Sequence, residues 1–278
     1  HQMEEGDVYI TNDPWLATGH LHDFTVVTPV FYEGSPVALF ASTCHVVDVG
    51  GLGFGPNARQ VYEEGINLPI LPLFKKGLVN QTLLDIVRAN VREPVLLEGD
   101  FFSLAACNET GVKRLKEMMK EFDLSGIASV ADLIVTRSEQ AMLTEIRKLP
   151  FGVYEYIMKI DGYENEIDLV AKMKIDETGI DVDFSGTSQI SSYGINVPLP
   201  YTQAYASFGI RCVVGSEIPN NAGSLAPVRV WAPEGSILNA APPCAVAARH
   251  AIGQMLPDVV LGCLDQACPD VVPAEGTS

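Results

Sequence analysis

The sequence has 278 residues, enough for one large domain or for two of ordinary size. Hydrophobic residues make up 47% of it, which supports a buried core, and 35 acidic residues against 18 Lys and Arg give a formal net charge of −17. This charge balance argues against binding to nucleic acids or anionic membranes through basic patches, and no apolar run is as long as a transmembrane helix.

The first residues of the chain and its cysteines indicate the cellular compartment of the protein. The sequence opens with HQMEEGD, without an initial Met and without a basic or apolar leader, so we expect no signal peptide and a central piece of a longer protein. Its six cysteines form no C-x-x-C pair. We therefore expect reduced, mostly buried thiols and a cytoplasmic protein.

Residues 1–99 are predicted to be rich in β-structure. Alternating and β-branched runs predict three strands, over residues 6–12, 24–31 and 37–43, the last two joined as a hairpin. Residues 49–57 hold four glycines and are not expected to form a regular element. Residues 80–92 place apolar side chains at helical spacing and are predicted to form a helix that ends before Pro94.

The rest of the chain is predicted to form a helical segment and then a segment of strands and helices. Residues 100–149 predict two or three packed helices, with Asp100 or Ser103 capping the first and Ser125 or Ser129 capping another. Beyond them, residues 150–278 are predicted to contain antiparallel strands and helices: a meander over 152–162, 167–176 and 179–186, a helix over 201–214, a strand over 226–232 and a helix over 245–264 broken or bent at Pro257.

These elements predict an α+β fold of mixed architecture. Antiparallel hairpins make up the segment 1–99, helices make up the segment 100–149, and the segment 150–278 forms a second lobe of antiparallel strands and helices. The sequence contains no internal repeat that would favour a solenoid instead.

Side chains that bind metals gather in the first of these segments. Six of them lie in one short window: Asp13, His20, His22, Asp23, His45 and Asp48. Imidazole and carboxylate together suit zinc, manganese or iron, although a histidine at a strand end is commonly no more than hydrogen-bonded. An extended strand would place His20 and His22 on one face and Asp23 on the other, whereas a turn would bring His20 and Asp23 together. In either geometry His45 is placed to supply a third ligand.

Other patterns offer weaker candidate sites. GGLGFG over residues 50–55 is similar to a phosphate loop but lacks the following Lys-Ser/Thr, so we interpret it as a tight turn. No G-x-S-x-G motif occurs. Cys44 beside His45 is interpreted as a buried thiol in preference to a nucleophile, and His250 as a helix-surface or capping residue. The sequence therefore predicts no nucleotide site in this chain.

Ten motifs follow one another along nearly the whole chain: GDVYITNDPWLATGHLHDFTVVTPVF (6–31), CHVVDVGG (44–51), YEEGINLP (62–69), NVREP (90–94), EGD (98–100), LPFGVY (149–154), VDFSGTS (182–188), IPNNAG (218–223), APEGSILN (232–239) and VAARH (246–250). In this order they resemble the hydantoinase B/5-oxoprolinase family, which includes N-methylhydantoinase B and caprolactamase B subunits and acetone carboxylase α subunits.

The resemblance implies a metal site on His20, Asp23 and His45, and so favours the turn over the strand. The chain departs from the family at Ala17-Thr18-Gly19, where Gly-Gly-Thr is usual, and at position 22, which is usually not His. His22 is therefore a candidate for a catalytic group beside the metal or for an alternative ligand. Asp13 and Asp48 lie in matching segments, and we assign them the role of orienting the imidazoles.

The resemblance also implies a division of labour between two subunits. A partner A-type subunit uses ATP to phosphorylate the substrate, and the B-type subunit receives the activated lactam or hydantoin at a divalent metal ion: zinc, manganese or iron. We expect the catalytic subunit of an ATP-dependent cyclic-amide hydrolase in a hetero-oligomer, with neither nucleic acid nor membrane as a partner. The alternative is the α-type subunit of an ATP-dependent, acetone-type ketone carboxylase, and a third interpretation is an assembly subunit without chemistry.

Overall fold

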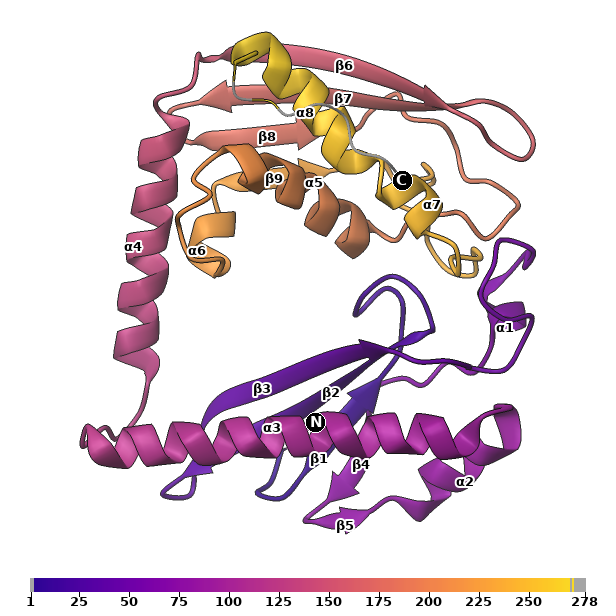
Figure 1. Cartoon of the computed structure of the whole chain (residues 1–278), viewed down its shortest axis with the longest axis vertical. Coiled ribbons are helices and arrows are strands. Elements are labelled where there is room, and N and C mark those ends of the chain that lie inside the picture. The colour runs from indigo at the N-terminus through magenta and orange to yellow at the C-terminus, as the bar shows by residue number, and fades with distance from the viewer. Residues whose placement is uncertain (1–2, 271, 273–278) are drawn as a thin grey trace.

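The computed structural model describes residues 3–270 and 272. Figure 1 shows two lobes, each built on its own β-sheet, with helices between and around them. This architecture confirms the predicted α+β class. Each sheet has a separate hydrophobic core. No helix within the described ranges is both long enough and apolar enough to cross a membrane.

The first sheet contains five antiparallel strands in the order β3-β2-β1-β4-β5. Their bounds are β1 Val8–Thr11, β2 Asp23–Tyr32, β3 Ser35–His45, β4 Leu71–Lys75 and β5 Leu78–Val79. The predicted hairpin is β2–β3, and its two-residue turn places Glu33 and Gly34 at φ values of 49° and 78°. Turns with two positive φ values match the twist of paired strands, which fixes the register. That register sets Asp23 directly opposite His45.

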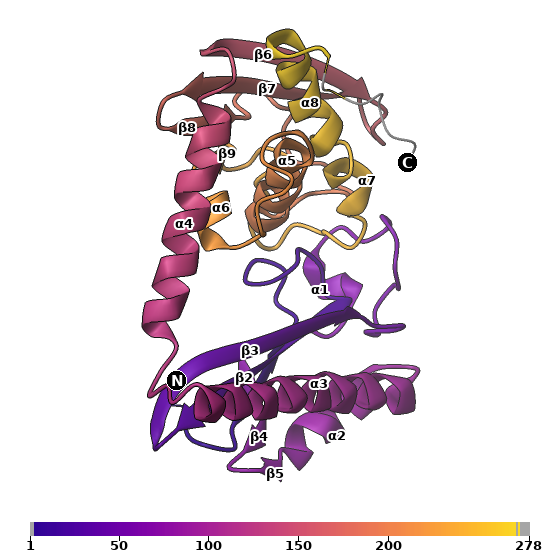
Figure 2. The same cartoon turned by 60° about the vertical axis from the view of Figure 1, so that its left-hand side comes forward.

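Helix α3 (Pro94–Glu121) covers one face of this sheet, packing on β2 and β3 (Figures 1 and 2). Phe24 of β2 and Phe101 of α3 are fully buried there, with ring centroids 4.7 Å apart. The shorter helices α1 (Val61–Glu64) and α2 (Gln81–Asn90) precede α3, and the side chain of Asn80 caps α2 by accepting from the backbone of Leu83. The site described below lies on the opposite face of the sheet, at one end of β2 and β3.

The predicted helical segment differs from the structure in its boundaries and packing. Helix α3 begins at Pro94 instead of near Asp100 or Ser103, because proline lacks the N–H that the first helical turn leaves unpaired. Helix α4 (Ala128–Ile146) follows Ile127 and has no side-chain cap from Ser125 or Ser129. The two helices do not form the expected packed group: α3 packs chiefly on the first sheet and α4 chiefly on α6 (Ala222–Leu225).

The second sheet has the order β6-β7-β8-β9, and its first three strands confirm the predicted meander. Its bounds are β6 Gly152–Ile160, β7 Ile167–Asp176, β8 Gly179–Asp183 and β9 Val228–Trp231. Strand β9 runs parallel to β8, an arrangement that the sequence pattern did not reveal. Helices α5 (Leu199–Val213) and α8 (Leu256–Ala267) pack together, and α8 also packs on β6 and β7.

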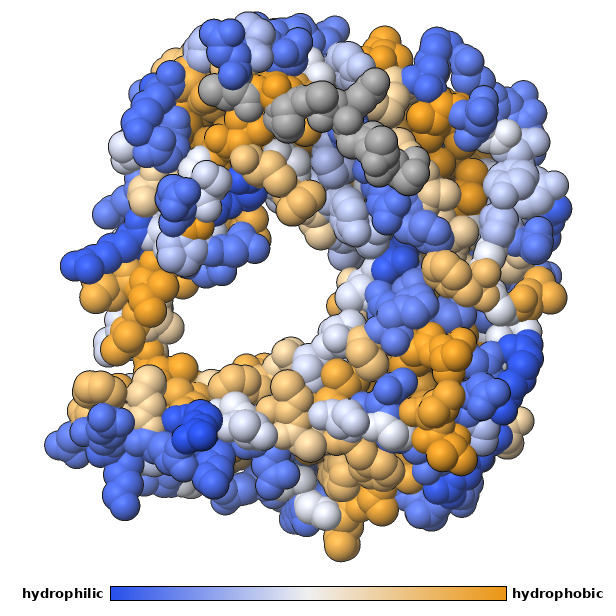
Figure 3. All heavy atoms as spheres, in the orientation of Figure 1, coloured by the Kyte–Doolittle hydropathy of each residue, from blue (hydrophilic) through white to orange (hydrophobic). Residues whose placement is uncertain are grey.

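The predicted helix over 245–264 is interrupted in the structure. Helix α7 (His250–Gly253) is a single turn, and Pro257 lies in the first turn of α8. The irregular residues before α7 cross to the first lobe, where the Trp15 side chain donates to the carbonyl of Ala240 at 2.7 Å. Figure 3 shows an open passage between the lobes, with α4 on one side of it. The lobes meet on the other side of this passage, where the candidate site lies.

A candidate metal centre between the two lobes

A turn before β2 brings the first two predicted ligands together. Gly19 has a φ of +94°, and a Cβ there would lie 2.7 Å from the Arg249 side chain, so only glycine fits. Residues 20–22 are irregular, and β2 begins at Asp23. As a result, Nε2 of His20 lies 2.8 Å from Oδ1 of Asp23. This convergence belongs to the turn geometry and excludes the arrangement on an extended strand.

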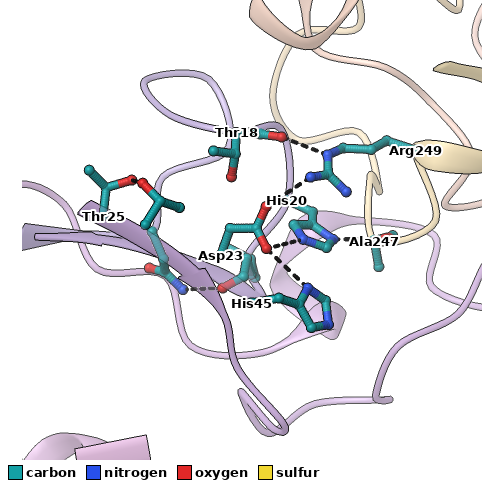
Figure 4. A network of polar contacts seen from close by, with 10 residues as sticks. Thr18, His20, Asp23, Thr25, His45, Ala247 and Arg249 are labelled. Carbon is teal, nitrogen blue, oxygen red and sulfur yellow. Dashed lines mark hydrogen bonds and ion pairs between the residues drawn. The ribbon is translucent and has the colours of Figure 1, made fainter. Parts of the chain in front are cut away.

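The neighbouring strand brings His45 to the same point (Figure 4). Nδ1 of His45 lies 3.0 Å from Oδ1 of Asp23, and one ligand atom from each of His20, Asp23 and His45 falls within 4.8 Å of the other two. Ligands bound to one zinc ion at about 2.0–2.2 Å lie about 3–3.5 Å apart. The three side chains therefore fit a divalent cation after small movements.

The hydrogen bonding of His20 supports a cation at this point. Its Nδ1 lies 3.1 Å from the carbonyl of Ala247, an acceptor, so Nδ1 carries the proton of the neutral ring. Nε2 then presents a lone pair toward the Asp23 carboxylate. The contact at 2.8 Å lacks hydrogen-bond geometry, and Nε2 is buried without a hydrogen-bond partner in the described structure. A lone pair and a carboxylate oxygen at this distance repel each other unless a positive charge lies between them.

Arg249 from the second lobe fixes the other oxygen of Asp23. Its Nη2 lies 2.9 Å from Oδ2 of Asp23, its Nε donates to the carbonyl of Thr18 at 2.7 Å, and its guanidinium lies over the Tyr201 ring. Burial alone would raise the pKa of Asp23, but the contacts with His20 and Arg249 outweigh it and hold that pKa well below its usual range. Asp23 therefore remains ionised at any physiological pH, as a metal ligand would have to be.

All four histidines within the described residues surround one aromatic ring. The ring centroid of Phe54 lies 5.7 Å from that of His20, 5.2 Å from those of His22 and His45, and 5.0 Å from that of His250. The sequence reasoning missed Phe54 and interpreted His250 as a surface or capping residue. The only local signals were the GGLGFG and VAARH motifs, which do not reveal that the two segments meet.

His22 joins this cluster without converging on the ligand atoms. Its ring is buried beside those of His20 and His45, and Nδ1 has no partner among the described residues. Burial, followed by the charges of the other two imidazoles, lowers the pKa of His22 to about 4. His22 is therefore neutral at physiological pH and lies beside the candidate metal ligands, while a role in catalysis stays a prediction.

The two carboxylates predicted to orient imidazoles have other partners in the structure. Asp13 accepts from the backbone of Trp15 at 2.9 Å and so shapes the turn before the site. Asp48 forms an ion pair with Arg92 and accepts from the backbone of Gly50. Both side chains hold loops around the centre, because nearby backbone N–H groups and a guanidinium are better placed donors than the ring nitrogens.

Replacing Asp48 with Asn should therefore affect stability more than metal binding. We expect the affinity for zinc to change by less than about tenfold, below the effect of losing a group bonded to a ligand. The free energy of unfolding should fall by about 1 kcal/mol, because the pair with Arg92 is partly exposed. Calorimetric zinc titration and urea unfolding measure the two effects. A loss of affinity above tenfold with an unchanged stability would assign Asp48 to the metal centre instead.

The glycine-rich loop and Cys44 behave as the sequence predicts. Gly50 has a φ of +78°, and a Cβ there would lie 2.2 Å from the carbonyl oxygen of Asn90, so the loop is a tight turn. Cys44 is half-buried against the first core, and burial raises the pKa of its thiol, which disfavours a nucleophile. All six cysteines are free, as expected, but the expectation that most are buried is wrong: Cys263 alone is buried, Cys107 and Cys212 are exposed, and the other three are half-buried.

Glu64 is a further residue that sequence reasoning did not single out. Its carboxylate is fully buried between the lobes, and Oε1 accepts from the backbone N–H groups of Val246 and Ala247 at 2.6 and 2.7 Å. The carbonyl of the same Ala247 accepts from His20. Glu64 therefore positions the peptide that selects the tautomer of His20, a candidate metal ligand.

Comparison with known proteins gives a consistent family. A model described as Hydantoinase B/oxoprolinase matches residues 1–278. A protein of Pseudomonas sp. strain NS671, provisionally named as the B component of a D-/L-hydantoinase, is 29% identical over 290 residues, covering 98% of this chain and 49% of that protein. The chain thus spans about half the length of such curated relatives.

Two solved structures share the fold. The ATP-dependent caprolactamase from Pseudomonas jessenii superposes with a TM-score of 0.91 at 24% identity, covering 97% of this chain and 48% of that one. Nucleotide-free acetone carboxylase superposes with a TM-score of 0.86 at 16% identity, covering 95% of this chain and 37% of that one. At these identities, the likeness shows the fold alone.

Proposed function

Because the chain belongs to the hydantoinase B/oxoprolinase family, we propose that it carries the metal-binding catalytic centre of an ATP-dependent hydrolase of cyclic amides. A partner A-type subunit would phosphorylate the lactam or hydantoin, and this chain would receive the activated substrate. The observation that carries the proposal is the convergence of ligand atoms from His20, Asp23 and His45 at the junction of the lobes.

The chain's own residues have distinct tasks in this reaction. His20, Asp23 and His45 would hold a divalent ion of zinc, manganese or iron, which when bound polarises the acyl oxygen and lowers the pKa of water. Arg249 fixes Asp23 through Oδ2 and leaves Oδ1 directed at the two imidazoles. His22 is buried and neutral beside them, so its unpartnered Nδ1 is placed to exchange a hydrogen bond with substrate or water.

A test of this proposal combines the chain with its partner. We expect no ATP turnover and no lactam hydrolysis by the isolated chain, because the structure describes no phosphate-binding loop with its lysine. Addition of the A-type subunit, ATP and a divalent metal should give hydrolysis of a lactam or hydantoin. Robust ATP turnover by the isolated chain would contradict the division of labour, and elemental analysis should find about one divalent ion per chain.

The second candidate is the α-type subunit of an ATP-dependent ketone carboxylase. Its support is the fold shared with acetone carboxylase together with a centre that could equally hold an enolate oxygen. The reconstituted complex separates the two reactions when it is given a ketone with and without bicarbonate. Carboxylation that requires bicarbonate would favour the second candidate, whereas cyclic-amide hydrolysis without bicarbonate favours the first. The intact ligand set counts against an assembly subunit without chemistry.

A further inference from the structure

Phe54 occupies an unusual position above the metal centre. The rings of His20, His22 and His45 form a triangle with centroids 5.0–5.5 Å apart, and Phe54 lies 5.2–5.7 Å from each of them. It meets all three edge-on, with interplanar angles of 73–83°. An aromatic ring in this position covers one face of the triangle and excludes water from it.

The outer part of the Phe54 side chain is open to solvent. The residue is 52% exposed, although one side of its ring contacts buried imidazoles. A half-exposed phenylalanine buries only part of its ring, so it leaves its position at a lower cost than a ring of the core. His250 supplies a second wall, since its ring stacks on Phe54 with an interplanar angle of 11°.

The backbone around Phe54 has a fixed base and a free tip. The base is anchored because Leu52 donates to the carbonyl of Glu63 at 2.9 Å, and the carbonyl of Pro56 accepts from Gly194 at 2.8 Å. Between these anchors, residues 53–55 make no backbone hydrogen bond in the described structure.

The two glycines that flank Phe54 also have open surroundings. A Cβ at Gly53 or Gly55 would meet nothing within 4 Å among the described atoms. Gly50, at the base of the same loop, is by contrast in close contact with Asn90. Gly53 has a φ of +85°, a conformation that favours glycine, whereas Gly55 meets neither a steric nor a conformational demand. Gly55 therefore gives this tip backbone freedom.

From these observations we propose that Phe54 is a movable cover of the metal centre. In the closed position it shields the buried rings of His20 and His22 from bulk water, and rotation of residues 53–55 admits metal and substrate. The cover gives a role to a glycine-rich loop that lacks the Lys-Ser/Thr of a phosphate loop. It also provides the water exclusion that an activated, hydrolysable substrate requires at a catalytic centre. The function of the cover rests on the proposed metal site. The shielding of the imidazoles by Phe54, however, does not require a bound ion.

The test compares Phe54→Ala with Leu52→Ala, a matched control. Leu52 is 63% exposed in the same loop and makes none of the ring contacts. In metal-free protein, we expect diethyl pyrocarbonate to modify His20 and His22 about tenfold faster in Phe54→Ala, and within about twofold of the wild-type rate in Leu52→Ala. Mass spectrometry of peptides measures each histidine separately. Phe54→Trp should restore protection, because a large aromatic ring again covers the imidazoles.

A second measurement follows the bound ion. Transfer of zinc from the loaded protein to a chelator should be about tenfold faster in Phe54→Ala and unchanged in Leu52→Ala. Circular dichroism establishes that each variant is folded. The proposal would be overturned if folded Phe54→Ala showed histidine modification and zinc transfer at rates within about twofold of the wild type. Faster histidine modification in a protein that binds no zinc would support the cover and refute the metal assignment.

Discussion

Replacing His45 with Ala should weaken zinc or manganese binding by more than about 100-fold, because it removes a ligand, whereas loss of a group behind a ligand costs about 10–100-fold. The imidazole of His45 is 51% exposed, so its removal should leave the fold intact. Asp23→Ala should have at least as large an effect on affinity. It should also lower stability, because Arg249 would remain buried without its carboxylate partner. Calorimetric titration of metal-free protein measures these affinities.

His22→Ala is the control for this series. His22 is as buried as His20 and lies beside it, but its nitrogens are not among the convergent ligand atoms. We expect its affinity for metal to fall by no more than about tenfold. The opposite pattern, in which His22→Ala abolishes binding and Asp23→Ala is tolerated, would restore the extended-strand alternative and refute the ligand set.

Replacing Glu64 with Gln should make the protein more stable than the wild type above neutral pH. Burial raises the pKa of Glu64 from 4.5 to about 7, despite two backbone donors that favour the carboxylate. The folded protein therefore holds a proton that the unfolded chain releases above pH 4.5. By linkage, stability is greatest below pH 4.5 and falls as the pH rises to about 7, by about 3 kcal/mol in total.

The measurement is the free energy of unfolding between about pH 5 and pH 8. The neutral glutamine imitates the protonated acid, so the variant should match the wild type near pH 5 and exceed its stability by about 3 kcal/mol at pH 8. Glu63→Gln, a change at the exposed neighbour, should leave the slope nearly unchanged. Parallel pH profiles for wild type and Glu64→Gln would show that Glu64 is ionised throughout. Glu64→Ala should be destabilising at every pH, because Val246 and Ala247 lose their acceptor.

Local patterns in the sequence were sufficient for most of the elements. The alternation in residues 23–45 and the glycine at position 34 encode the β2–β3 hairpin, because both act on neighbouring backbone. The predicted start of α3, near Asp100 or Ser103, is wrong because Pro94 does two things. It ends the preceding helical segment and also begins α3. The parallel pairing of β9 with β8 joins segments far apart in the chain, and no local pattern specifies it.

The sequence, with help from the family resemblance, also predicted which candidate ligands converge in the structure. The spacing of His20, His22 and Asp23 did not decide between an extended strand and a turn, because it suits either geometry. The structure decides for the turn, through the confined Gly19 and the register that sets Asp23 opposite His45. Sequence therefore determined which side chains are available, and the fold determined which atoms of them meet.

Only the tertiary structure shows which distant residues contact these side chains. Arg249 and Ala247 reach Asp23 and His20 across 226 and 227 positions in the chain, and Phe54 meets His250 in the same way. Hydrophobic periodicity reports whether a residue faces a core, but it carries no information on which distant segment lies opposite. The charge partner of Asp23, the tautomer of His20 and the stacking of Phe54 on His250 arise where the two lobes meet, and packing between the lobes decides them.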